Sequence, residues 1–393
     1  MRVRTALDQY RVRTQDEIYE ALGTATIVLD TNVLTGLYGV SPELREARLG
    51  VLKQISDRLW VPYQVGLEFH RNRARVIRDL SDAYKSVRDT LTPVKKAAKT
   101  FGKSKFSESQ ARVQKAVDEA VAKLEGELRK LEADDGHHLK PADDKLLDRI
   151  ETLLDGRVGT APSAKLTRKR VRKFVTIRAP ERIPPGFSDI SKIATSGPTD
   201  AAGDFLVWCE MLQYARTSKS NVVFVTDDGK EDWWEKGGDG VPTRPLPALL
   251  AEFARKTGQN YYQVSTESLM RWARDSLNAE VSTANLTEES AISRERRSES
   301  ALEEALRARI WGQTQTDWDH IRSALTARTV HNFDAMKFPT IAYDLDALKF
   351  PAIEFSPDLY QNLFSGFNLY GKVIEANPKE EGEDQDEPGD GNR

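Results

Sequence analysis

The stretch that decides the fold is NVVFVTDDGKEDWW, residues 221–234, in which an apolar run ends in two adjacent aspartates. Its β-branched first half predicts a strand, and TDDG is typical of a turn. A second run of this kind, ATIVLD at residues 25–30, also ends in an aspartate. Continuous apolar runs of this length are typical of parallel strands that are covered on both faces. The question is why two buried strands should each end in carboxylates.

Further strand and helix patterns alternate with these two runs. LWVP at 59–62 and NYYQVS at 260–265 predict strands, while helical spacing begins near residue 64, near residue 204 and at residue 247. This alternation predicts an α/β domain with a mainly parallel sheet and helices on both faces. The C-terminal ends of parallel strands share one edge of the sheet, where ligands bind. The aspartates that end the two strands should therefore converge there.

A long helical insertion is predicted at about residues 75–165, where charged residues and alanine dominate. Pro93 and the following TFGKSKF, residues 100–106, predict a break between two helices. The second helix carries a coiled-coil-like seam with apolar residues spaced by three and four. The seam consists of Val113, Val117, Ala120, Leu124, Leu128 and Leu131.

The two ends of the chain differ from its middle. Residues 1–24 are a charged N-terminal extension, and residues 275–375 are predicted to form a separate, mostly helical accessory region. That region contains the repeat FDAMKFPTI, from residue 333, and LDALKFPAI, from residue 345. Residues 376–393 are acidic and are predicted to be a disordered tail. With no long apolar run and one cysteine, we expect a cytoplasmic protein without a membrane span or disulfides.

Five acidic residues are candidates for a catalytic site. Each has an ordinary alternative, such as a helix cap, a surface ion pair or turn chemistry. Gathered at one sheet edge, they would raise one another's pKa, and a divalent cation would remove that cost. Ligands that are all oxygen suit Mg²⁺ or Mn²⁺, so we infer metal-assisted attack of water on a phosphodiester. The five are Asp30, Glu68, Asp204, Asp227 and Asp228.

Four sequence blocks in this order resemble the PIN-like nuclease family, and more narrowly a bacterial subgroup with a helical insertion and a TDDxKxDWW motif. The blocks are TIVLDTNVLTGLY, VGLEFHR, GDFLVWCEML and VVFVTDDGKEDWW, and RIPPGFSD also fits the subgroup. The resemblance covers roughly residues 25–270. It implies an α/β/α sandwich and an endoribonuclease that depends on Mg²⁺ or Mn²⁺.

The resemblance also implies roles for individual residues. Asp30 and Asp204 match direct metal ligands, and Glu68 matches the helix acid that orients water or completes a second metal site. The match in the last block is ambiguous between Asp227 and Asp228, and Asp228 fits slightly better. The resemblance further implies supporting positions around the ligands at Asn32, Thr226 and Asp232.

A nucleic-acid surface must be local, because the net charge of the chain is −3. The segment KLTRKRVRK, residues 165–173, is the candidate; its alternative is a solvated face that pairs with acids of the insertion. For a row of arginines at 71, 75 and 78 we favour the solvated face. Trp233 and Trp234 either pack in the core or stack on a base. The predicted binding residues are Arg168, Lys169, Arg170, Arg172 and Lys173.

Two other functions remain open. A haloacid-dehalogenase-type phosphatase would need a second acid at position 32, where this chain has Asn32, and a lysine before the late acid pair, whereas Lys230 follows it. A non-catalytic scaffold would use the insertion or the C-terminal region for a protein partner or self-association. The PIN-like resemblance alone suggests a toxin-like or phage-defence role.

Overall fold

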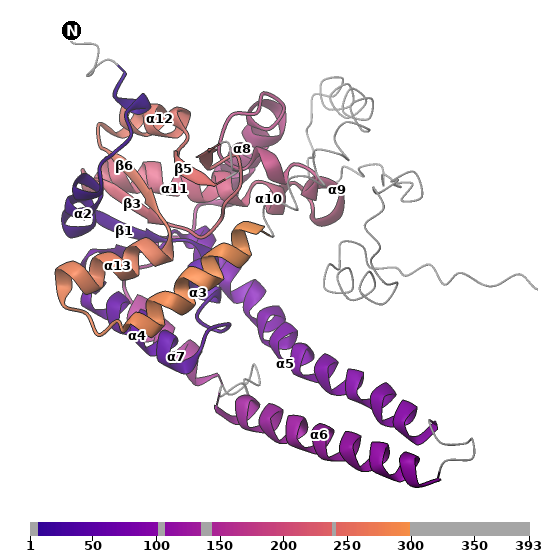
Figure 1. Cartoon of the computed structure of the whole chain (residues 1–393). Helices are drawn as coiled ribbons and strands as arrows, with labels where there is room; N and C mark the ends of the chain where they lie inside the picture. Colours follow the sequence, from indigo (N-terminus) through magenta and orange to yellow (C-terminus); the bar gives the residue numbers. More distant parts are fainter. Residues whose placement is uncertain (1–6, 101–106, 135–143, 238–240, 299–393) are drawn as a thin grey trace, which may run out of the picture. The chain divides into compact units, whose positions relative to one another are not determined.

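The computed structural model describes residues 7–100, 107–134, 144–237 and 241–298 (Figure 1). Its centre is a four-stranded sheet in the order β2-β1-β3-β6, and every pairing is parallel. This confirms the predicted α/β fold with a mainly parallel sheet. The strands are β1 (Thr26–Leu29), β2 (Leu59–Trp60), β3 (Val222–Val225) and β6 (Tyr261–Val264).

Helices cover both faces of this sheet, which is why all residues of β1 and β3 are buried. On one face α11 (Gly203–Ser218) packs against α12 (Pro247–Thr257) and the beginning of α5 (Tyr63–Thr100). On the other, α13 (Thr266–Leu277) packs against α2 (Gln15–Thr24) and α4 (Pro42–Gln54). The strand order reverses at β1, because β2 lies on one side of it and β3 on the other. The edge beyond β1 and β3 is therefore the switch point where such folds bind ligands.

Shorter elements connect this framework. The strands β4 (Trp234–Lys236) and β5 (Pro242–Pro245) form a small antiparallel pair after β3. The loop before α11 is built from short helical turns, as the proline-rich sequence there requires. The remaining elements are η1 (Asp8–Tyr10), α3 (Thr31–Thr35), η2 (Ser56–Arg58), α7 (Lys145–Leu154), α8 (Ala164–Lys173), η3 (Phe174–Arg178), η4 (Phe187–Asp189), α9 (Lys192–Ser196) and α10 (Pro198–Ala201).

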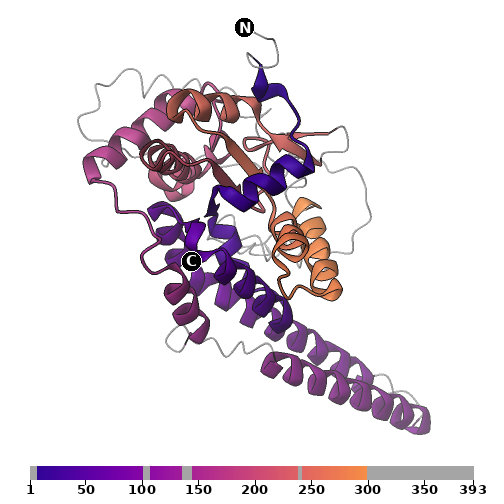
Figure 2. The same ribbon diagram turned by 90° about the vertical axis from the view of Figure 1, so that its left-hand side faces the viewer.

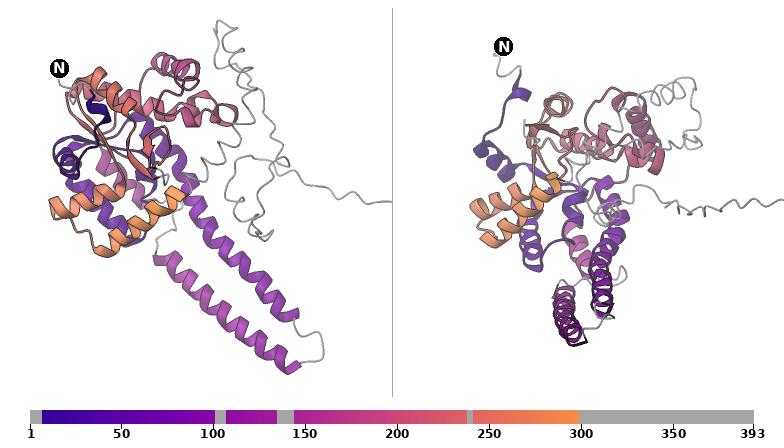
Figure 3. Two further views of the ribbon diagram at one scale, coloured as in Figure 1. Left: turned by 45° about the horizontal axis from the view of Figure 1, so that its top comes forward. Right: turned by 45° about the vertical axis from the view of Figure 1, so that its right-hand side comes forward.

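The helical insertion contains α5 and α6 (Ser107–Asp134), which lie side by side in all views (Figure 1, Figure 2 and Figure 3). The predicted break between the two helices is confirmed at TFGKSKF, because α5 ends at Thr100 and α6 begins at Ser107. Pro93 lies inside α5, so the part of the prediction that rested on this proline is wrong; α5 continues because packing against α6 supports it. The buried contact is made by Leu91, Val121 and Leu128. Four of the six residues of the predicted seam face solvent instead, because two helices bury only one stripe of each other. The exposed members are Val113, Ala120, Leu124 and Leu131.

A helical segment at residues 283–298 packs on the α/β domain (orange in Figure 1). Arg48 forms a two-pronged ion pair with Glu289, at 2.9 and 2.8 Å, and both side chains are about fully buried. Glu288 accepts hydrogen bonds from the backbone and hydroxyl of Ser41, at 2.9 and 2.6 Å. The rest of the predicted accessory region, with its KFP repeat, and the predicted acidic tail lie outside the described residues. No helix among the described residues is long and apolar enough to cross a membrane.

The buried Arg48–Glu289 pair gives a prediction about stability. Glu289→Ala should lower the free energy of unfolding by about 3–5 kcal/mol, because it leaves the Arg48 charge buried without a partner. Chemical denaturation followed by circular dichroism measures this change. The matched control is Glu46→Ala, which removes an exposed pair with Arg149 and should cost no more than about 1 kcal/mol. Equal losses in the two variants would contradict the prediction.

Candidate active site

Asp30 lies at the switch point, directly after β1, and ties three segments together. One carboxylate oxygen, Oδ1, accepts a hydrogen bond of 2.7 Å from the backbone of Thr31 and so caps α3. The other, Oδ2, accepts from the Thr226 hydroxyl at 2.6 Å and from Asn32 Nδ2 at 2.7 Å. Thr226 directly follows β3, so the hydrogen bonds fix the Asp30 carboxylate between the ends of two adjacent strands.

The adjacent aspartates after β3 have different surroundings. The carboxylate of Asp227 accepts from the backbone and hydroxyl of Thr266, at 2.8 and 2.9 Å, and lies 2.5 Å from Arg296 Nη1. Asp227 is thus held at the start of α13 and by residues 283–298. Asp228 instead turns toward Lys230, whose backbone and ammonium nitrogens lie 3.0 and 2.9 Å from its carboxylate. Of the two, Asp228 is the one whose charge acts on Asp30 and Asp204.

Glu68 and Asp204 approach from two helices on the same face of the sheet. Glu68, on α5, accepts from Gln64 Nε2 at 2.7 Å and from the Thr31 hydroxyl at 3.1 Å. Asp204 lies in the first turn of α11. The residue before it is Gly203, where an added Cβ would lie only 2.6 Å from Glu68 Oε1. A glycine at this position therefore lets the Glu68 carboxylate lie against the start of α11.

Trp233 and Trp234, in the turn after β3, donate hydrogen bonds to Asp204 and Asp228. Trp233 is buried, and its indole nitrogen donates to Asp204 Oδ2 at 3.2 Å. Trp234 is half-buried and donates to the backbone oxygen of Asp228 at 2.6 Å. Of the two uses predicted for this pair, the structure shows the packing role for Trp233, which lies against Trp208 and Phe224.

Two members of the site were not predicted from sequence. Lys230 Nζ lies 2.9 Å from Asp228, 3.2 Å from Asp189 and 3.7 Å from Asp204. Asp189 is buried and comes from η4, at the end of the RIPPGFSD block. That block was noticed in the sequence, but a loop has no periodicity that places one side chain. We call Asp30, Glu68, Asp189, Asp204 and Asp228 the acid cluster.

Asp232 is not a member of the acid cluster, but it holds the loop that contributes Asp189. It is buried, and its Oδ2 accepts from the backbone nitrogens of Gly186 and Ser188, at 3.1 and 2.9 Å. These bonds hold the loop that brings Asp189 to the site. Burial raises the pKa of Asp232 to about 7, against the lowering effect of Lys230.

Gathering these carboxylates disfavours their charged forms and so raises their pKa values. Burial, followed by the charge of Asp204, raises the pKa of Asp30 to about 8, although the Thr226 hydrogen bond lowers it. Burial also raises the pKa of Glu68 and that of Asp204, and each is raised further by other acids of the cluster. Charged forms that are disfavoured in this way become favourable when a cation binds.

The donor set fits a hard divalent cation. All five members of the acid cluster present oxygen, and hydrogen bonds from neighbouring residues orient the carboxylates, as is usual around metal ligands. Within the described residues, no three acidic, histidine or cysteine side chains already stand close enough to hold an ion. Ion binding therefore requires these side chains to draw together, and the charge of the ion would offset the repulsion between their carboxylates.

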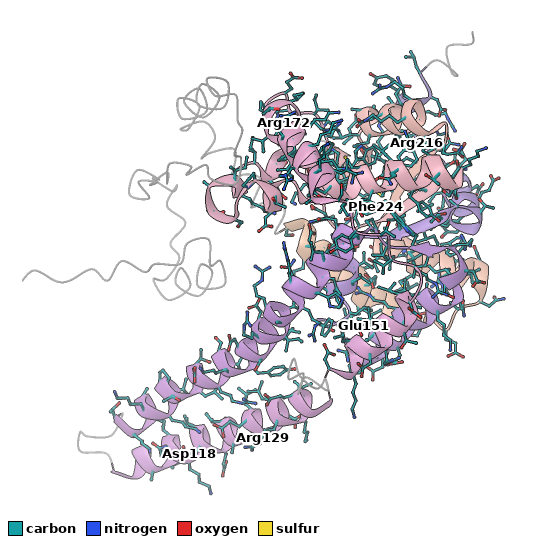
Figure 4. All side chains as sticks on the ribbon, turned by 180° about the vertical axis from the view of Figure 1, so that it is seen from behind. Asp118, Arg129, Glu151, Arg172, Arg216 and Phe224 are labelled. Atoms are coloured by element: carbon teal, nitrogen blue, oxygen red, sulfur yellow. The ribbon has the colours of Figure 1, made fainter. Side chains whose placement is uncertain are left out.

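The predicted nucleic-acid residues lie on α8 and differ in exposure. Arg168, Lys169, Arg172 and Lys173 are exposed, and none is within ion-pair distance of an acid among the described residues. Figure 4 shows Arg172 at the surface, whereas Phe224 lies inside the sheet. Arg170 is half-buried and donates to Gln213 of α11 at 2.9 Å. The alternative of pairing with acids of the insertion finds no ion pair in the described part of the chain.

The fold is thus an α/β/α sandwich with an acidic site at the switch point of its parallel sheet. A comparison with protein families matches residues 26–249, more than half of the chain, to the family described as PIN like domain. The chain belongs to this PIN-like family, whose members are generally nucleases, hydrolases that act on nucleic acids. The bacterial subgroup stays a prediction. Searches of curated proteins and of solved structures found no match.

Gly203 gives a prediction specific to this site. In Gly203→Ala the new methyl group should push the end of the Glu68 side chain away, while the fold remains because only a flexible group must move. We expect Mn²⁺ affinity to fall by about 10–100-fold, the usual effect of disturbing groups that position ligands. Titration calorimetry measures the affinity, and thermal melting checks the fold.

Gly50→Ala, on α4, is the control, because an added Cβ there meets no atom within 4 Å. Both variants place alanine in a helix, and because Gly50 lies inside α4 whereas Gly203 is the first residue of α11, the control experiences the larger helix-propensity effect. Unchanged Mn²⁺ affinity in Gly203→Ala would show that Glu68 does not act in ion binding.

Proposed function

We propose that this chain is a metal-dependent endoribonuclease that hydrolyses phosphodiester bonds with Mg²⁺ or Mn²⁺. The observation that supports this proposal best is the meeting of Asp30, Glu68, Asp204 and Asp228 at the switch point. These acids come from segments far apart in the sequence, and each acts electrostatically on others of the group. No helix cap or surface ion pair requires such a meeting.

The bound ion would be held by Asp30, Asp204 and Glu68, while the charge of Asp228 acts on Asp30 and Asp204 from the same edge of the sheet. When bound, a divalent ion lowers the pKa of water and stabilises the charge that develops on a phosphate. Asn32 and Thr226 keep the Asp30 carboxylate in place through their hydrogen bonds. Gln64 and Thr31 do the same for Glu68, which is placed to orient water. Asp227 has no part in this proposal, because its carboxylate is bound at α13.

The exposed cations of α8 supply a surface for the phosphate backbone. Arg168, Lys169, Arg172 and Lys173 stand free of acidic partners in the described residues, so phosphates need not displace an existing ion pair. Contacts of this type give affinity that does not depend on sequence and falls as salt rises. A single-stranded RNA is the substrate class we propose on the basis of the family resemblance.

Asp204→Asn tests the proposed chemistry. It removes one charge while keeping the shape of the side chain, so the cleavage rate should fall about 100-fold or more. The assay follows labelled RNA and single-stranded DNA with Mn²⁺ or with EDTA. The control is Asp200→Asn, four residues earlier on α10, whose exposed carboxylate pairs with Arg71 at 3.4 Å. Cleavage that persists in EDTA, or in Asp204→Asn, would refute the proposal.

The α8 surface gives a separate prediction. Changing Arg168, Lys169, Arg172 and Lys173 together to alanine should weaken RNA binding and make the dependence of the affinity on salt less steep. Both quantities are measured by filter binding, with the changes made in the Asp204→Asn variant, which should not cleave the RNA. The matched control changes Arg112 and Lys123 on α6, which carry the same kind of charge away from α8. An unchanged salt slope in the α8 variant would exclude this surface.

A further inference from the structure

The acid cluster contains a positive charge of its own. The Lys230 ammonium lies within ion-pair distance of three of its carboxylates: Asp228 at 2.9 Å, Asp189 at 3.2 Å and Asp204 at 3.7 Å. Only 16% of the Lys230 side chain is exposed, so these contacts are largely shielded from water. One cation that bridges several carboxylates is the arrangement that a second divalent ion would also create.

The turn after β3 fixes Lys230 in this position. Its backbone nitrogen donates to Asp228 Oδ1 at 3.0 Å, and its backbone oxygen accepts from the nitrogens of Trp233 and Trp234, at 3.2 and 3.1 Å. The turn thus holds the ammonium among three carboxylates, and its departure would leave them without that charge.

The other half of the acid cluster has no such partner. Within the described residues, Asp30 and Glu68 form no ion pair, and their printed hydrogen bonds come only from neutral donors. Asp204 stands between the two halves. Its contacts with Lys230 and Trp233 both go through Oδ2. The charge that still needs a cation is therefore on Asp30 and Glu68, with Asp204 beside them.

We propose that Lys230 takes the place of a second divalent ion, so that this chain binds one ion, on the Asp30, Glu68 and Asp204 side. Lys230 supplies a permanent positive charge between Asp189 and Asp228, because it is attached to the chain and does not exchange with solvent. Binding of a second ion would require the ammonium to leave three carboxylates. The inference rests on the proposed function, since it concerns the same acid cluster.

Counting bound Mn²⁺ on the full chain tests this inference. After removal of metal with EDTA, titration calorimetry and the paramagnetic resonance of free Mn²⁺ should both give one ion for the wild type. Lys230→Met keeps the length of the side chain but not its charge, and should bind two. Adding Asp189→Asn to Lys230→Met removes a ligand of the new site and should restore a count of one.

Two further variants act as controls. Lys230→Arg keeps the charge and should bind one ion. Lys192→Met removes another lysine that contacts Asp189, at 2.8 Å, but whose side chain is 44% exposed, and should also bind one. Two ions on the wild type, or one on folded Lys230→Met, would overturn the inference. A wild-type count of two overturns the inference even if Lys230→Met does not fold.

The RNA assay separates this result from the proposed function. Metal-dependent cleavage together with two ions on the wild type would overturn the role of Lys230 and leave the nuclease proposal standing. Counts of one and two without any cleavage would overturn the nuclease proposal and support the role of Lys230. Absence of Mn²⁺ binding would overturn both.

Discussion

The hydrogen bond of 2.6 Å between the Thr226 hydroxyl and Asp30 is the interaction on which the site depends. It joins the C-terminal ends of β1 and β3, the two central strands, at the switch point of the sheet. Because these strands pair in parallel from Thr26 to Leu29, their last residues must lie side by side. The sheet thus forces acids from distant parts of the sequence together, and hydrogen bonds must then hold them against their mutual repulsion.

Neighbouring elements resolve that repulsion in different ways. Asp227 is drawn away from the cluster by Thr266 and Arg296, whereas Asp228 stays and is paired with Lys230. The adjacent aspartates therefore have separate functions in one motif: one fixes the turn to α13 and residues 283–298, and the other completes the acid cluster. The two aspartates look equivalent in the sequence, but Asp227 contributes to packing and Asp228 to the acid cluster.

Much of this arrangement follows from the sequence, but not all. Continuous apolar runs predict β1 and β3, and acids at their ends predict an acidic sheet edge. The sequence does not separate Asp227 from Asp228, because both follow the strand and only tertiary contacts turn one away. Asp189 and Lys230 lie in turns without periodicity, so no spacing rule connects them. The sequence also does not show that most of the α6 seam is exposed, since a repeat shows which residues are apolar but not how many partners cover them.

The same logic explains why the turn after β3 is so dense in charged and aromatic residues. The carboxylates of the acid cluster need a cation beside them even before a metal ion binds. Lys230, two residues beyond Asp228, can reach back to the Asp228 carboxylate only if the turn is held rigidly. Trp233 and Trp234 supply that rigidity, because their backbone nitrogens bind the Lys230 carbonyl while their indoles bind Asp204 and Asp228. Asp232, directly before them in the chain, anchors the loop that contains Asp189. Each residue of KEDWW except the exposed Glu231 thus serves the charge balance of the site.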